Sequence, residues 1–363
     1  MMKLISLCFL LLFTLNIFGS NTDSEFRQGM YLRTDIVAGA NFDTLLTIAA
    51  QSGINNVVFD IKDMKGKLYV KINDCPTLLN KPGDLIVNLP ELVSKIHAAD
   101  MMATARIVAF HNNRAAKVDS SFCPKDSLGN RWIEIPSKGP QWLDPSLVDV
   151  QNDLFKLMDV VIKAGVDEIQ FDYIRFPTQG NVSKAIFEFQ RENDRQLFLD
   201  STYVAKSKMD IIEDFLRKVD KRYKGNKVHF TADIFAIVSW QNQRDIEATG
   251  QDIRRMSKYL DVIHPMIYSS HFDNGFGYRQ DVHNEPYDII FKGIKRTTSK
   301  LTPGCEVVPY IQANNWLVIY KKEYIAAQVA ACREAGAAGY LLWNATLNYQ
   351  TTLGWLTELN TNQ

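Results

Sequence analysis

Eight short apolar segments recur along this chain, and a longer amphipathic stretch follows each of them. The segments read as near-continuous hydrophobic runs, which is typical of strands buried on both faces of a parallel sheet. We expect the strands at residues 29–32, 56–61, 102–110, 168–172, 227–234, 262–268, 306–311 and 338–343. The expected helices span residues 42–51, 90–99, 148–164, 185–223, 249–258, 286–298, 324–335 and 351–359.

This alternation of strands and helices predicts an α/β fold, a (β/α)8 TIM barrel that forms a single domain over residues 29–360. An open, doubly wound sheet is the alternative, but no glycine-rich phosphate-binding loop follows the first strand. The 363 residues, of which 46% are hydrophobic, suffice for one large core. Residues 21–28 are expected to form a short linker into the barrel.

The first twenty residues have the pattern of an export signal peptide. Lys3 supplies a positive charge, residues 4–18 form an apolar run, and Gly19 and Ser20 are small residues of the kind found at a cleavage site. The run is shorter than the ~20 apolar residues of a membrane span, although a retained N-terminal anchor is the alternative to cleavage. We therefore expect a secreted protein, or one of the periplasm or cell envelope, without an integral membrane domain.

Charge and motif content narrow the expected partners and cofactors. The 41 basic and 41 acidic residues cancel without long runs of either sign, so we expect neither nucleic acid nor an anionic membrane as a partner. The six histidines are scattered, and the cysteines form no Cys-x-x-Cys pair, so no metal site is predicted. Gly-x-Ser-x-Gly and Walker-type loops do not occur, and no organic cofactor is expected. The sequence leaves the oligomeric state open.

Two cysteines fall in loop-like stretches after neighbouring strands, Cys75 and Cys123. Because export permits disulfides, this pair is a candidate bridge. Free buried thiols are the alternative interpretation.

Polar residues gather where the expected strands end. In a barrel of this kind, the working residues occupy the C-terminal strand ends and the loops that follow. Those ends and their flanks carry Asp60, Asp63, Arg106, His111, Asp172, Arg175, Asp233, Tyr268, His271, Tyr310, Gln312 and Trp343. A purely structural barrel has no need for acids at the ends of strands two, four and five together, so we interpret this convergence as functional.

Two carboxylates that face one cleft are what cleavage of an O-glycosidic bond requires. One protonates the leaving oxygen, while the other attacks the sugar carbon or activates a water. Asp172 and Asp233 end adjacent strands about 5 Å apart, so we expect them to form this pair, with Asp60 as a third catalytic candidate. A structural role is the alternative for each: Asp172 as the cap of the next turn, and Asp233 as a buried acid held by backbone amides.

The remaining strand-end residues are expected to bind a carbohydrate substrate. Arg106 and Arg175 are placed to pair with the acids and keep one ionised, although an ordinary ion pair is the alternative for Arg106. Tyr268 and His271 are placed to donate to sugar hydroxyls, and Trp343 offers a flat apolar face to a pyranose ring or packs in the core. We also expect Asp63, His111, Tyr310 and Gln312 to bind the substrate.

Four motifs resemble a known group of proteins. Phe-Asp-Ile-Lys-Asp at 59–63, Phe-Asp-Tyr-Ile-Arg-Phe-Pro at 171–177, Ala-Asp-Ile-Phe at 232–235 and His-Pro-Met-Ile-Tyr-Ser-Ser-His-Phe at 264–272 are similar to the bacterial "putative glycosyl hydrolase" domain family, which is itself similar to α-amylase-type barrels. The resemblance spans roughly residues 29–355. It implies a (β/α)8 barrel that acts on a carbohydrate, with the acid at the fourth strand end, Asp172, as the nucleophile.

The chain departs from the α-amylase-type pattern at two strand ends. The fifth strand ends in Asp233, where that pattern has a glutamate. The seventh ends in Tyr310, Ile311 and Gln312, where many retaining barrels carry the second carboxylate. A catalytically inactive barrel that binds polysaccharide is therefore the alternative function.

Overall fold

A computed structural model describes residues 26–361 apart from Gln241 and Arg279. The predicted export signal at residues 1–20 and most of the predicted linker lie outside the described residues. The strands are β1 Arg27–Leu32, β2 Asn56–Lys62, β3 Met102–Val108, β4 Glu168–Asp172, β5 His229–Phe235, β6 Val262–Ile267, β7 Glu306–Val307, β8 Tyr310–Gln312 and β9 Gly339–Trp343. The helices are α1 Thr34–Val37, α2 Phe42–Gln51, α3 Leu89–His97, α4 Asn113–Val118, α5 Val148–Lys163, α6 Glu188–Leu199, α7 Lys208–Tyr223, α8 Gln243–Thr249, α9 Ile253–Met256, α10 Pro286–Thr298, α11 Lys322–Ala335 and α12 Gln350–Thr361.

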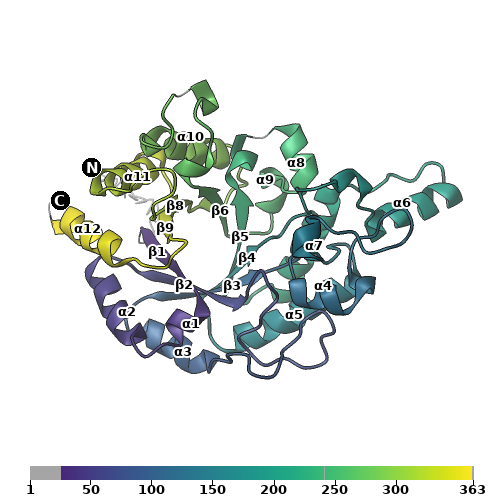
Figure 1. Cartoon of the computed structure of the whole chain (residues 1–363), viewed down its shortest axis with the longest axis horizontal. Coiled ribbons are helices and arrows are strands. Elements are labelled where there is room, and N and C mark those ends of the chain that lie inside the picture. Colours follow the sequence, from purple (N-terminus) through teal and green to yellow (C-terminus); the bar gives the residue numbers. More distant parts are fainter. Residues whose placement is uncertain (1–25, 241, 279, 362–363) are drawn as a thin grey trace, which may run out of the picture.

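The strands close into a parallel barrel that the helices surround (Figure 1). Strand β1 pairs with both β2 and β9, and β5 pairs with β6, so the sheet has no free edge. The seventh barrel position is shared by β7 and β8, which both pair with β6. Pro309 lies between them and has no N–H for the ladder, which explains the interruption of the predicted strand 306–311. The predicted (β/α)8 barrel is confirmed.

Two of the predicted helices have different bounds in the structure. The stretch 185–223 is not one helix, because α6 ends at Leu199 and α7 begins after Ser207, whose hydroxyl accepts from the Asp210 N–H. The predicted helix 249–258 is shorter, because α8 ends at Thr249, Gly250 follows as its cap with φ of 76°, and α9 covers only Ile253–Met256. Left-handed glycine is a common helix end.

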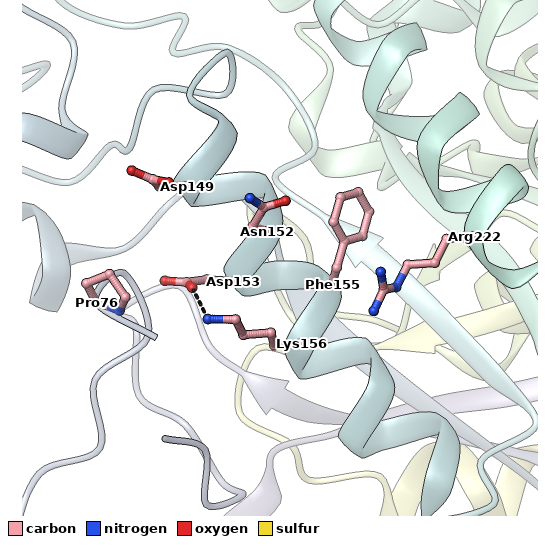
Figure 2. Close-up of a pocket in the computed structure, with 7 residues that line it drawn as sticks. All are labelled: Pro76, Asp149, Asn152, Asp153, Phe155, Lys156 and Arg222. Atoms are coloured by element: carbon pink, nitrogen blue, oxygen red, sulfur yellow. Dashed lines mark ion pairs between the residues drawn. The ribbon is translucent and has the colours of Figure 1, made fainter. Parts of the chain in front are cut away.

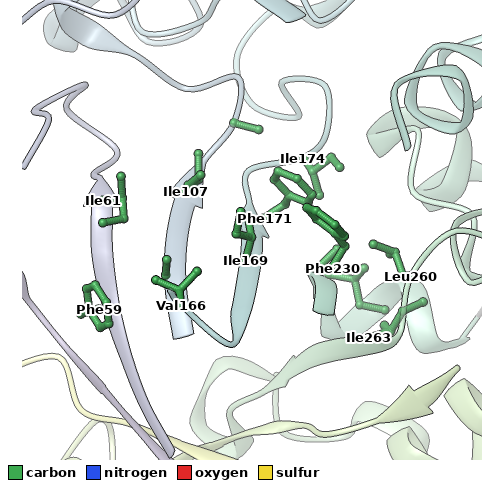
Figure 3. Close-up of a cluster of buried hydrophobic side chains, with 14 of the residues drawn as sticks. Phe59, Ile61, Ile107, Val166, Ile169, Phe171, Ile174, Phe230, Leu260 and Ile263 are labelled. Atoms are coloured by element: carbon green, nitrogen blue, oxygen red, sulfur yellow. The ribbon is translucent and has the colours of Figure 1, made fainter. Parts of the chain in front are cut away.

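Two hydrophobic clusters hold the barrel together. The larger lies between the outer faces of the strands and the helices, and Figure 3 shows several of its strand residues, including Phe59, Ile169 and Phe171. The smaller lies inside the barrel and consists of Val58, Val262, Tyr268, Val308, Tyr310 and Leu341. Strands β3, β4 and β5 contribute none of these six residues. Most of their inward positions carry polar side chains instead, among them Arg106, Gln170 and Asp233, which makes one side of the barrel interior hydrophilic.

The predicted Cys75–Cys123 bridge is wrong. The thiols of Cys75, Cys123, Cys305 and Cys332 are all free. The Cys123 thiol lies 3.6 Å from the carbonyl oxygens of both Ala116 and Asp119, within its own loop. The alternative interpretation of free buried thiols therefore holds for this pair.

No helix within the described part of the chain is long and apolar enough to cross a membrane.

Candidate active site

Arg106 on β3 lies among three carboxylates from neighbouring strands. Its Nη1 donates to Asp60 on β2, its Nη2 donates to Asp172 on β4, and its Nε lies 3.9 Å from Asp233 Oδ2 on β5. The register pairs Phe171 with Ala232, which sets Asp172 beside Asp233 at the next position. Both acids thus approach one planar guanidinium, Asp172 at Nη2 and Asp233 at Nε. The predicted convergence of Asp60, Asp172 and Asp233 is present.

One cation therefore faces three acids, and Asp233 is the acid that Arg106 contacts least closely. Its side chain is fully buried, and Gln170 Nε2 donates to its Oδ1 over 2.9 Å. Burial raises the pKa of Asp233 well above its ordinary value, and the negative charge of Asp172 raises it further. Arg106 opposes these effects without cancelling them. Asp233 therefore favours its protonated form more strongly than an exposed aspartate does.

Asp172 is held as a hydrogen-bond acceptor at both oxygens. Oδ2 accepts from Arg106, and Oδ1 accepts from the Tyr173 backbone N–H over 2.6 Å. The Tyr173 backbone has φ of 48°, in the left-handed region that costs a non-glycine residue about 1 kcal/mol. The chain thus leaves β4 through a strained turn whose N–H points at the carboxylate.

Asp60 supports Arg106 from the opposite side. The Tyr31 hydroxyl donates to Asp60 Oδ2 over 2.7 Å, and the Arg106 guanidinium lies 5.2 Å from the centre of the Tyr31 ring. Burial raises the pKa of Asp60, and Arg106 counters it. Tyr31 and Asp60 together fix the position of the guanidinium that Asp172 contacts.

Arg175 does not pair with the acids as the sequence suggested. Its guanidinium lies 4.9 Å from the ring centres of both Trp142 and Tyr173 and 4.2 Å from that of Phe235. One of its N–H groups donates to the Phe176 carbonyl oxygen. Among the described residues, no carboxylate lies within ion-pair distance of it. Its role here is to fill an aromatic box behind Tyr173, because the rings surround it.

Three other predicted binding residues have their polar groups engaged by the protein itself. His111 is buried, its Nδ1 lies 2.6 Å from the Met64 carbonyl oxygen, and burial lowers its pKa to about 4. Asp63 Oδ1 accepts the N–H groups of Lys65 and Lys67 and so caps the turn after β2. The Gln312 amide binds Ser270 and the Asn314 carbonyl oxygen.

Tyr310, Tyr268, Trp343 and His271 lie on the other side of the acids. The Tyr310 hydroxyl donates to Gln170 Oε1 over 3.1 Å and so extends the hydrogen bonds around Asp233. The rings of Tyr268 and Trp343 are stacked, with centres 4.6 Å apart. His271 packs edge-on against both, at 5.1 and 5.9 Å. Burial raises the pKa of Tyr268, and the charges of Asp233 and Asp172 add to the effect. Tyr268 and Tyr310 therefore lie near the carboxylates, and Trp343 and His271 pack on Tyr268.

Three residues of the site were not predicted: Tyr31, Gln170 and Tyr173. A signal for Gln170 exists, because Glu168, Gln170 and Asp172 alternate with apolar residues and so share the inner face of β4. Tyr31 lies two residues after Gly29 on the same face of β1, but no neighbouring residue in the sequence indicates a functional role for it.

A hollow of about 340 Å³ lies on the outer side of the molecule, along α5 (Figure 2). Three of its charged groups are in ion pairs: Lys156 Nζ lies 3.5 Å from Asp153 Oδ1, and Arg222 lies 2.7 Å from Asp159 Oδ2. Asp153 also accepts from the Thr77 N–H and hydroxyl. The hollow includes none of the strand-end residues, and we assign it no role.

Within the described residues, no group of three or more His, Cys, Asp or Glu side chains is arranged to hold a metal ion. The guanidinium of Arg106 occupies the place between the three carboxylates that a cation would take.

Comparison with solved structures shows the same fold. The glycoside hydrolase domain of PgaB (BpsB) from Bordetella bronchiseptica aligns with a TM-score of 0.64 and 13% identity, over 92% of this chain and 98% of that one. The catalytic domain of β-amylase from Paenibacillus polymyxa aligns with a TM-score of 0.57 and 10% identity, over 88% and 92% of the two chains. No curated protein matches the sequence.

A family model covers most of the described barrel. It matches residues 29–349, from the third residue of β1 to the residue before α12. The residues matched include Asp60, Arg106, Asp172 and Asp233. The chain belongs to the family described as "putative glycosyl hydrolase domain".

Proposed function

We propose that this chain hydrolyses O-glycosidic bonds of a poly- or oligosaccharide, with Asp172 and Asp233 as the catalytic carboxylate pair. The family description and the glycoside hydrolase fold support the reaction class. The observation that carries the proposal is the unequal state of two neighbouring acids. Asp172 accepts from a guanidinium and a backbone N–H, whereas burial and the negative charge of Asp172 raise the pKa of Asp233.

The unequal pair matches the two tasks of the reaction. Asp233 donates its proton to the glycosidic oxygen as the bond to the anomeric carbon breaks. Asp172, as the anion, faces the anomeric carbon and stabilises the positive charge that develops there. Water then supplies a hydroxyl to that carbon, and its remaining proton goes to a carboxylate of the pair. The reaction needs no metal or organic cofactor.

The surrounding residues have supporting roles in this proposal. Asp60 and Tyr31 hold Arg106, which in turn holds Asp172. Tyr268 and Trp343 supply aromatic surface beside the acids, where a sugar ring can stack. The sequence pattern of residues 1–20 supports export, which would bring the chain to glycans outside the cell or in its envelope.

The test is Asp172→Asn, assayed with the wild-type chain on a panel of polysaccharides. We expect hydrolysis of at least one glycan by the wild type and a loss of about 10³-fold or more in the variant. The matched control is Asp220→Asn, which makes the same change at an exposed position on α7. Circular dichroism confirms that each variant is folded.

Two outcomes would overturn the proposal. A folded Asp172→Asn variant that hydrolyses at the wild-type rate removes Asp172 from the reaction. A wild-type chain that binds a glycan without cleaving any member of the panel instead supports an inactive, polysaccharide-binding barrel.

A further inference from the structure

Two groups of aromatic side chains flank the carboxylates, and they differ in exposure. The group behind Tyr173 is closed, because Trp142 is only 3% exposed and His111 and Arg175 cover its ring. Trp142 and His111 therefore pack against protein, whereas Tyr173 is half-buried. The other group offers the more open aromatic surface.

The second group forms a row that opens toward solvent. Tyr268 is 7% exposed beside the acids, and Trp343, stacked on it, is half-buried. His271 is exposed and packs against Trp343. Its ring centre lies 6.1 Å from that of Trp316, which is 54% exposed. The row thus runs from the carboxylates to the rim of the barrel, with its most open ring farthest out.

The loop that carries Trp316 is held in place by hydrogen bonds. Residues 313–321 follow β8, and the Ala313 carbonyl oxygen accepts from Asn344 Nδ2 over 2.8 Å. Asn315 Oδ1 accepts the Tyr320 N–H over 2.8 Å, which closes the loop on itself. Tyr320 is buried, and its hydroxyl lies 3.3 Å from the Ser269 hydroxyl. The exposure of Trp316 is therefore fixed by the fold, and such preorganisation lowers the entropy cost of binding.

The chemistry of the row suits an uncharged sugar. Leu317 and Ile319 beside Trp316 are also mostly exposed, so the tip of the loop is an apolar surface of the kind that marks ligand sites. The C–H face of a pyranose ring packs well on indole, while its hydroxyls stay in water. His271 is the one member that could carry a positive charge, and partial desolvation by its aromatic neighbours lowers its pKa, so its protonated form is disfavoured.

We propose that Trp316, His271 and Trp343 form a distal subsite for a pyranose unit of an uncharged oligosaccharide. The substrate is then a chain that extends from the carboxylate pair, across Trp343, to the loop at residues 313–321. The proposal rests on the proposed function for the inner end of this path.

The test measures binding and turnover of uncharged oligosaccharides of increasing length. The series is chosen from cello-, chito-, malto- and manno-oligosaccharides by the binding of the wild-type chain. We expect Trp316→Ala to weaken the affinity for the longer members about tenfold and to leave a single-sugar aryl glycoside unaffected. Trp316→Phe keeps an aromatic face and should retain most of the affinity. The control is Phe198→Ala, because Phe198 is 90% exposed at the end of α6, far from β8 and β9 in Figure 1.

The outcomes separate this inference from the proposed function. If Trp316→Ala weakens binding of long oligosaccharides while no hydrolysis occurs, the result supports the distal subsite and refutes the proposed hydrolysis. If the wild type hydrolyses a glycan and Trp316→Ala behaves like wild type at every length, the subsite fails alone. Equal weakening at every length, tighter binding of oligogalacturonides than of the uncharged series, or binding of no oligosaccharide also overturns the subsite.

Discussion

Two buried acids of the same barrel, Glu168 and Asp233, have pKa values that are shifted in opposite directions. Glu168 begins β4, and its Oε2 lies 2.6 Å from Arg27 Nη1 while His264 Nε2 lies 3.6 Å from Oε1. Burial alone would raise its pKa, but Arg27 and His264 outweigh burial and lower it to about 2. Asp233 is equally buried, but its partners are the neutral Gln170 amide and an arginine, Arg106, that also binds two other acids. Its pKa is raised.

The difference shows that partners, and not depth of burial, decide the state of each acid. Arg27 forms an ion pair with a single carboxylate at the N-terminal end of the barrel, whereas Arg106 contacts three carboxylates toward the C-terminal end. In barrels of this kind, the N-terminal end maintains stability and the C-terminal end performs chemistry. We therefore expect substitutions of Glu168 and Asp233 to affect different properties.

The largest effect is expected for Asp233→Asn on activity. Asparagine keeps the shape of the protonated acid but cannot donate its proton, so we expect kcat/KM to fall about 10²- to 10⁴-fold. The free energy of unfolding should stay unchanged or rise, because a buried acid without a full partner is removed. Steady-state kinetics and urea denaturation test the two halves. A clear loss of stability with activity retained would reverse the roles assigned to the two acids.

Glu168→Gln should have the opposite profile. Removing one partner of a buried ion pair leaves Arg27 without its counter-charge and lowers the free energy of unfolding by about 3–5 kcal/mol. Turnover per folded molecule should remain at the wild-type level, since Glu168 lies at the other end of β4 from Asp172. Denaturation combined with active-fraction kinetics measures both. An equally stable variant would mean that Arg27 does not stabilise the barrel through this pair.

The same pair makes a pH-dependent contribution to stability. The pKa of Glu168 is lowered from about 4.5 to about 2 in the fold, so its contribution is complete above pH 4.5 and disappears as pH falls toward 2. The expected change is about 3 kcal/mol, measured as the difference between wild type and Glu168→Gln at each pH. A difference that is constant between pH 6 and pH 2 would contradict the assignment.

The smallest effect concerns the strained turn after Asp172. Tyr173→Ala and Tyr173→Gly both remove the ring, but only glycine adopts a φ of 48° without strain. We expect the glycine variant to be more stable than the alanine variant by about 1 kcal/mol, as measured by thermal unfolding. Equal stability of the two variants would show that the turn carries no strain.

Much of the fold followed from the sequence because strand and helix periods are local properties. The pairing of Asp172 with Asp233 also followed, since consecutive strands of a parallel barrel are neighbours and both acids come late in their strands. The interruption at Pro309 and the caps at Ser207 and Gly250 are local too, but they were hidden within longer stretches of suitable composition.

The contacts of individual side chains did not follow from their positions. Arg175 and Arg106 both lie near strand ends, yet one is stacked among rings and the other contacts three acids. His111 and Gln312 also lie near strand ends, but the loops around them use their polar groups. Trp316 is in a loop without periodicity, so its place beside His271 depends on tertiary structure.

The most direct measurement is the titration of the Asp233 carboxyl group itself. The ¹³C NMR spectrum of the chain labelled at aspartate carboxyl carbons is followed with pH, and the Asp233 resonance is identified by its loss in Asp233→Asn. We expect this resonance to titrate well above the ordinary aspartate value of about 4, because burial and the negative charge of Asp172 both favour the protonated form of Asp233. A resonance that titrates at or below about 4 would contradict the proposed division of roles between the two acids.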